Sequence, residues 1–172
     1  HMRSDQLPVN EYSKFNATYI NALENVELFE ELEISLHDFI KFVQNIPMDK
    51  FDYSYAEGKW TIKEIIQHII DTERIFAYRA LRISRNDKTP LPGFEENHYV
   101  DNTDAKNRSI QDLLTEFSAV RHSNLLMFKS FSDEQLRRIG IASQHEVSVR
   151  ALGFLIIGHM KHHQKIFIER YL

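Results

Sequence analysis

The chain of 172 residues contains no cysteine. It therefore has no disulfide bond, no thiolate nucleophile and no thiolate metal ligand, and any metal site must use His, Asp, Glu and water. The chain also lacks an excess of positive charge. Its formal net charge is -4, whereas a basic patch is expected in a nucleic-acid-binding protein. Composition thus gives no sign of nucleic acid as a partner.

Long hydrophobic runs are also missing. No apolar stretch reaches the roughly 18 residues of a membrane span, and no signal peptide is visible, so a cytoplasmic location without membrane contact follows by default. The length suits one domain with a full-sized core. His1 reads as a remnant of cloning, with Met2 as the natural start. We expect a flexible polar N-terminus over residues 1–10 and a single domain over residues 11–172.

Apolar residues recur at helical spacing in four long segments, at about 26–43, 61–84, 109–128 and 148–172. Thr61, followed three residues later by Glu64, forms a capping box that marks the start of the second segment. Residues 11–23 predict a short helix or a strap on the main body, and residues 142–146 a turn or short hairpin. Four long amphipathic helices in one domain predict an all-α four-helix bundle.

The connection between the second and third predicted helices is unusually long. Residues 87–107 contain the turn signals Thr89-Pro90, Leu91-Pro92-Gly93 and Asp101-Asn102. Loops of this length in compact domains are often functional or form lids. His98 lies within this segment, and the sequence assigns it no role.

Two histidines lie in the middle of the apolar row of the last predicted helix. His159 and His163 are four residues apart, on the same face as Leu152 and Ile166. Burying an imidazole is costly unless its nitrogens have partners, and two imidazoles one turn apart can share a metal ion. The alternative is a pair of core-edge histidines, each hydrogen-bonded to a polar neighbour. His162 is interpreted as a surface or supporting residue.

His68 is the candidate third ligand, since it lies in a similar apolar pattern about two turns into the second predicted helix. Taken alone, it is more typical of a hydrogen-bonded core histidine. If the two helices face each other, the three imidazoles converge. Three neutral imidazoles with an open position are typical of catalytic zinc, and nickel or another divalent ion accepts the same donors.

Three charged residues near these positions have two interpretations each. Asp71, one turn beyond His68, is a candidate to orient a ligand imidazole or to act as a base on metal-bound water; a solvated or salt-bridged acid is the alternative. Arg79 shares the row of His68, and Arg170 holds the equivalent place on the last helix. Either would pair with buried acids or receive a substrate anion, and structural pairing is the favoured interpretation.

Several motifs together resemble the DinB-like superfamily, and within it the YfiT-type branch of bacterial proteins labelled metal-dependent hydrolases. The resemblance runs from about residue 12 to the last residue. Its motifs fall in the expected order, and they are Lys59–Glu64 (KWTIKE), His68–Arg82 (HIIDTERIFAYRALR), Leu91–Phe94 (LPGF), Gly158–His163 (GHMKHH) and Glu169–Leu172 (ERYL).

The resemblance implies an up-down-down-up four-helix bundle, consistent with the long crossover at residues 87–107. It implies a metal triad of His68, His159 and His163. Relatives of this kind include S-transferases that use bacillithiol and isomerases that use mycothiol, and many members form homodimers.

Three functions are compatible with these observations. The first is a metal-dependent hydrolase that activates water on a small-molecule substrate. The second is a thiol-dependent S-transferase, with a low-molecular-weight thiol such as bacillithiol bound to the metal. The third is a non-catalytic bundle, either stabilised by a metal and binding a ligand or with histidines that merely fill space.

Overall fold

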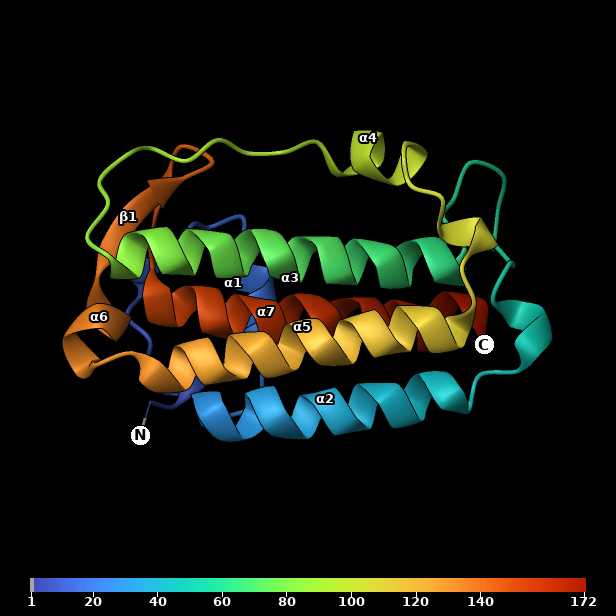
Figure 1. Ribbon diagram of the computed structural model, residues 1–172, viewed down its shortest axis with the longest axis horizontal. Helices are drawn as coiled ribbons and strands as arrows, with labels where there is room; N and C mark the ends of the chain where they lie inside the picture. Colours follow the sequence, from blue (N-terminus) through green and yellow to red (C-terminus); the bar gives the residue numbers. More distant parts are fainter. Residues whose placement is uncertain (1) are drawn as a thin grey trace.

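The computed structural model describes residues 2–172, so His1 and its interpretation as a cloning remnant lie outside the described residues. The body of the protein is formed by four long helices, α2 (Leu28–Gln44), α3 (Ile62–Ser84), α5 (Ile110–Ser130) and α7 (Val149–Ile166). In Figure 1, α2 and α7 run in one direction and α3 and α5 in the other. This is the predicted up-down-down-up bundle. Because α3 and α5 are parallel, the chain must cross the full length of the bundle between them.

Local capping signals set where the long helices begin. The Thr61 hydroxyl accepts a hydrogen bond from the Glu64 backbone N–H (3.2 Å), and the Glu64 carboxylate accepts one from the Thr61 N–H (2.9 Å). Ser109 and Ser148 cap α5 and α7 through their hydroxyls, which accept from the backbone N–H groups of Asp112 and Ala151, without the reciprocal side-chain bond. These caps satisfy backbone donors that a helix leaves unpaired at its first turn. The predicted helix starts are therefore confirmed.

The crossover is more structured than a plain loop. It contains the short helix α4 (Glu96–Asp101) and the 3-10 turn η4 (Ala105–Asn107), which lie along one side of the bundle (Figure 1). Near its start, Leu91 pairs with the edge of a small hairpin, donating its N–H to Ile141 O (2.9 Å) and accepting from Ser143 N–H (3.0 Å). These contacts tie the start of the crossover to the hairpin, and α4 and η4 pack against α3.

The hairpin follows the short helix α6 (Asp133–Arg137) and consists of antiparallel strands β1 (Ile139–Ala142) and β2 (His145–Ser148). Its two turn residues, Ser143 and Gln144, have positive φ angles of 50° and 70°. That combination belongs to the two-residue turn that matches strand twist. The hairpin therefore ends sharply, with Ser143 directed toward the crossover.

The N-terminal segment packs against the bundle. It forms the 3-10 turns η1 (Ser4–Gln6) and η2 (Val9–Glu11) and the helix α1 (Ala17–Asn21). The polar composition of residues 1–10 favoured a flexible segment. In the structure, however, Ser4 and Leu7 are buried, and the backbone of Arg3 forms an isolated antiparallel β-bridge with that of Glu27. The physical reason is that their partners lie far along the chain. Composition does not report such long-range contacts.

The core has two clusters of buried apolar side chains, toward the two ends of the bundle. Between them lies a polar centre around Arg121 of α5, which is fully buried. Its guanidinium donates to the Glu73 carboxylate of α3 (2.9–3.1 Å) and to Ser35 Oγ of α2 (2.8 Å). Asn124 donates a further bond to Glu73 (3.0 Å). Because Met160 of α7 also contacts Arg121, the centre joins all four helices.

None of the helices in the described part of the chain combines the length and apolar character that a membrane span needs.

Candidate metal site and its cavity

The three histidines singled out by the sequence come together between α3 and α7. His159 lies in the centre, with its Nε2 atom 3.1 Å from His68 Nε2 and 3.2 Å from His163 Nε2. His68 and His159 are buried, and His163 lies at the edge of the group. The helices meet here because α3 packs more extensively against α7 than against any other long helix. The three imidazoles thus present nitrogens to one common point.

Burial keeps these imidazoles neutral near pH 7. It lowers the pKa of His68 to about 4. Burial, with added repulsion from the neighbouring imidazoles, lowers the pKa of His163 to about 3 and that of His159 well below its usual value. A neutral imidazole offers a lone pair on one ring nitrogen, which is the form that binds metals. The group is therefore ready to donate to a cation without first losing protons.

The spacing of the three nitrogens fits a metal better than mutual hydrogen bonding. A single Nε2 carries either one proton or one lone pair in the ring plane, so His159 cannot pair well with both neighbours at once. Zinc–nitrogen bonds of about 2.0–2.1 Å in a tetrahedron put the ligand nitrogens roughly 3.3 Å apart. The observed 3.1 and 3.2 Å separations lie close to this value. The donor set therefore fits a divalent ion.

Neighbouring side chains set the orientation of the imidazoles. Thr72 Oγ1 lies 3.5 Å from His68 Nδ1, one turn away on the same helix. The Trp60 ring packs on His68 with a centroid separation of 4.9 Å, and Tyr171 Oη donates to the Trp60 carbonyl (2.6 Å). The segment that leads into α3 thus packs on the His68 ring, and Tyr171 holds that segment in place. His163 Nδ1 is buried and has no hydrogen-bond partner among the described residues.

A glycine brings the N-terminal strap against the site. A Cβ at Gly158 would lie 2.5 Å from the backbone oxygen of Tyr19, so only glycine allows α1 to approach α7 this closely. The Tyr19 ring then makes edge contacts with His159 and with the exposed His162. His162 therefore supports the site from outside, as the sequence indicated. Residues 11–23 contain the short helix α1 and lie as a strap against α7, so both predicted features are present.

Asp71 lies in a different network from the histidines. It is half-buried and accepts a hydrogen bond from Gln67 Nε2 (3.0 Å). Burial raises its pKa, and the charged groups that act on it are Glu116, Arg74 and Arg108. Around α3, Asp71 lies about 60° to one side of His68 and Thr72 about 40° to the other; Asp71 contacts Gln67, whereas Thr72 contacts the His68 ring. The structure therefore turns Asp71 away from the imidazoles.

The carboxylate near the histidines is Glu96, which the sequence analysis missed. It is the first residue of α4, and its Oε2 lies 3.6 Å from His68 Nε2. Because His68 is neutral near pH 7, this contact is not an ion pair. Partial burial, with a smaller contribution from Glu95, raises the pKa of Glu96. The sequence did show the acidic pair Glu95-Glu96 in the long crossover. Its closeness to His68 became visible only once the fold of the crossover was known.

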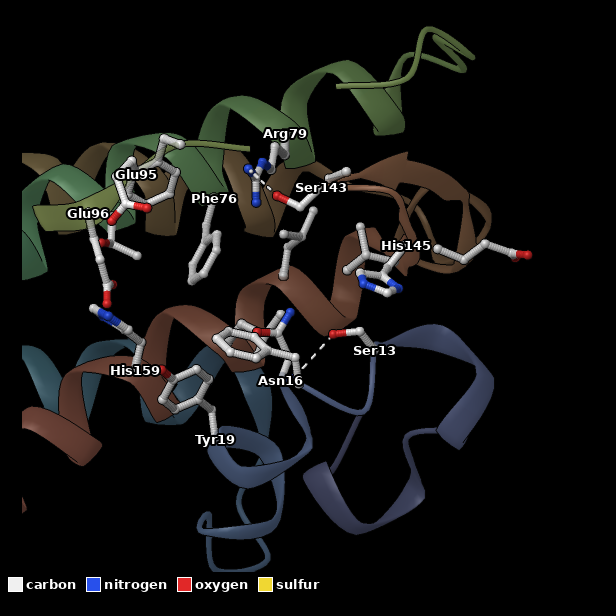
Figure 2. A pocket seen from close by; sticks show the side chains of 18 residues that line it. Ser13, Asn16, Tyr19, Phe76, Arg79, Glu95, Glu96, Ser143, His145 and His159 are labelled. Atoms are coloured by element: carbon white, nitrogen blue, oxygen red, sulfur yellow. Dashed lines mark hydrogen bonds between the residues drawn. The ribbon is translucent and has the colours of Figure 1, made fainter. Parts of the chain in front are cut away.

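A cavity of about 430 Å³ opens beside the histidines. Its volume lies within the range of small-ligand sites. His159 and Glu96 line one end, and Arg79 and Ser143 line the other (Figure 2). Thr72 also belongs to the lining, which is mixed: it includes the apolar side chains Phe76, Phe94, Leu152 and Leu155 and the polar ones Ser13, Asn16 and His145.

Arg79 and Arg170, the two arginines weighed in the sequence, differ in position. Arg79 is buried at the cavity and donates to the Pro92 carbonyl (3.1 Å) and Ser143 Oγ (3.2 Å). Arg170 is exposed and lies over the Tyr55 ring. Neither forms an ion pair with an acid within residues 2–172. The expected structural pairing with buried acids is absent from the described residues.

A family model described as the DinB superfamily matches residues 31–167. The chain belongs to the DinB superfamily. A protein of Oceanobacillus iheyensis named "Putative metal-dependent hydrolase" is 20% identical over 139 residues, which cover 80% of this chain and 79% of that protein. A Bacillus cereus protein with the same descriptive name is 22% identical over 78 residues, covering 45% of this chain and 44% of its own. These matches confirm the predicted resemblance.

The fold also has a solved counterpart. It is similar to YfiT from Bacillus subtilis, described as "a probable metal-dependent hydrolase with an unusual four-helix bundle topology". The TM-score is 0.69 at 17% identity, with 95% of this chain and 90% of that chain covered. At this identity the likeness establishes the fold, and it agrees with the up-down-down-up order seen in Figure 1.

Proposed function

We propose that this DinB superfamily member is a metal-dependent hydrolase of a small molecule, with His68, His159 and His163 as the metal ligands. The observation that carries the proposal is the convergence of three neutral imidazole Nε2 atoms at one end of a cavity, beside a carboxylate. The names of the two relatives and of YfiT agree with this function.

Zinc or nickel is the proposed ion, because both accept three nitrogen donors and leave a position open. When bound, such an ion supplies a Lewis acid and lowers the pKa of water. The neutral imidazoles leave its positive charge uncompensated, which strengthens both effects. A His68 ring that binds the ion through Nε2 would carry its proton on Nδ1, where Thr72 Oγ1 lies 3.5 Å away.

Glu96 is the proposed general base. Its Oε2 atom takes a proton from the attacking water and returns it to the leaving group of the substrate. The raised pKa of Glu96 suits this role, because a base works best when its pKa approaches the working pH. α4 sets the position of the carboxylate, and the Tyr19 strap closes the opposite side of His159.

The test compares Glu96→Gln with Asp71→Asn in protein loaded with zinc or nickel. Turnover of a panel of chromogenic small esters and amides is measured, together with metal content. We expect Glu96→Gln to keep the metal and lose about 10²–10⁴-fold in turnover, while Asp71→Asn keeps both. Asp71 is the matched control because its half-buried carboxylate lies one turn from His68 but faces away.

Adding a low-molecular-weight thiol to the same assay separates hydrolysis from thiol transfer. Product that forms only with bacillithiol, and that carries the thiol, would replace the hydrolase proposal with the S-transferase alternative. Full turnover in metal-free protein would contradict both.

A further inference from the structure

Arg79 is a buried cation without an anionic partner. Its side chain is only 7% exposed, and within residues 2–172 no carboxylate pairs with it. Burying a charge without a counter-charge is costly, and burial lowers the pKa of this guanidinium. The other deeply buried arginine, Arg121, is fully matched by Glu73 and its neighbours. Arg79 is therefore unusual within its own protein.

The two hydrogen bonds of Arg79 leave much of its guanidinium available. Both use Nη2, which donates to the Pro92 carbonyl and to Ser143 Oγ. Nε and Nη1 make no hydrogen bond within residues 2–172. Neither atom is fully buried without a partner, so their N–H groups are accessible to a ligand. Figure 2 shows the guanidinium facing the cavity between Phe76 and Ser143. The crossover and the hairpin thus hold one side of the group and leave the other directed at a ligand.

The cavity joins this cation to the histidine end of the site past the ring of Phe76. Thr72 and Arg79 both line it and are seven residues apart on α3, a rise of about 10 Å. Phe76 lies between them on the same face and also contacts the guanidinium. A ligand that fills the cavity therefore meets a positive group at one end and His159 at the other, with the aromatic ring of Phe76 and the aliphatic side chains of Leu152 and Leu155 available to its body beside polar groups such as Asn16.

We propose that Arg79 binds the carboxylate of an apolar-bodied substrate, which places the reacting bond of that substrate at the histidine end. The inference rests on the proposed function for what happens at the histidines. A carboxylate matches the planar fork of a guanidinium. A single negative charge also fits better than a phosphate dianion, because Glu95, Glu96 and Glu146 line the same cavity and repel further negative charge.

The experiment uses two probes of the same shape, 4-fluorobenzoate and 4-fluorobenzamide. Their binding to the full-length protein is measured by fluorine NMR, as purified and again after metal has been removed with a chelator and dialysis. We expect the acid to bind about tenfold to a hundredfold more tightly than the amide, which corresponds to a charge-assisted hydrogen bond. We expect this preference to persist without metal, because the carboxylate binds Arg79 and not the ion.

Variants locate the preference. Arg79→Gln should remove it, Arg79→Lys should retain part of it, and Arg170→Gln, an exposed arginine outside the cavity, should leave it unchanged. Equal binding of acid and amide by the natural protein, or no binding of either, would overturn the inference. So would an acid preference that survives in folded Arg79→Gln. The acid–amide comparison needs no variant, so it decides the question even if Arg79→Gln does not fold.

Metal content, measured on the same samples, keeps this test separate from the proposed function. Acid preference without any metal binding would contradict the hydrolase proposal and leave the anion site in place. Metal binding without acid preference would contradict the anion site at Arg79 and leave the hydrolase proposal in place.

Discussion

Replacing Arg121 with Met should destabilise the protein strongly, because it leaves the Glu73 carboxylate buried without its cation. Glu73 is 3% exposed and receives three of its hydrogen bonds from Arg121. Only the bond from Asn124 would remain. Breaking a buried ion pair in this way costs about 3–5 kcal/mol. For a chain of this size, that loss lowers Tm by roughly 6–20 °C.

The assay is urea denaturation of metal-free protein, so that metal binding does not mask the change in unfolding free energy. Arg74→Met is the matched control, since Arg74 forms an exposed ion pair with Glu116 that is worth about 1 kcal/mol or less. In the double variant Arg121→Met with Glu73→Gln, both charges are gone and Asn124 keeps an acceptor. We expect it to recover about 2 kcal/mol relative to Arg121→Met.

Two results would refute this reasoning. The first is an Arg121→Met variant no less stable than Arg74→Met. The second is a double variant less stable than Arg121→Met alone. That result would mean that the unpaired Glu73 carboxylate does not destabilise the Arg121→Met variant.

Three further predictions concern the site and its supports. Burial lowers the pKa of His68 to about 4 from 6.5 and also lowers the pKa values of His159 and His163, so the unfolded chain binds more protons than the folded one below pH 6.5. Metal-free protein should therefore lose about 3 kcal/mol through His68 alone as pH falls from 6.5 to 4, and more with the other two histidines; a flat stability profile in denaturation experiments would contradict this. Gly158→Ala should displace the Tyr19 strap and lower the unfolding free energy by about 1–3 kcal/mol, with altered NMR shifts for Tyr19; unchanged shifts would show that the contact is not tight. Thr61→Ala should cost about 1 kcal/mol through loss of the α3 cap, measured as a lower Tm, and no change would mean that another group replaces the cap.

The bundle was predictable because its signals are local. Hydrophobic periodicity and N-cap residues such as Thr61 and Ser109 act within a few residues of chain, so they mark each helix without knowledge of the rest. The order of the helices came from the family resemblance. The hairpin was only one of two options for residues 142–146, since Ser143 and Gln144 adopt positive φ without the glycine or asparagine that usually announces such a turn.

The histidine positions were predictable for a related reason. His159 and His163 share one face of a helix whatever its surroundings, the apolar pattern around His68 made it the candidate third ligand, and the family motifs supported all three positions. Glu96 was not predictable, because it approaches His68 only after the crossover folds back along the bundle. Asp71 is close to His68 in sequence but is directed elsewhere by helix rotation. The choice of zinc or nickel, a low-molecular-weight thiol, the homodimer and the cytoplasmic location stay predictions.

The measurement that tests the central claim most directly is metal content by mass spectrometry, on protein purified without a metal-affinity step and after addition of zinc or nickel. The account predicts about one divalent ion per chain in the natural protein, and its loss in both His68→Ala and His163→Ala. Circular dichroism would confirm that both variants remain helical. A natural protein that takes up neither ion would contradict the account and leave a bundle in which three buried histidines only pack against one another.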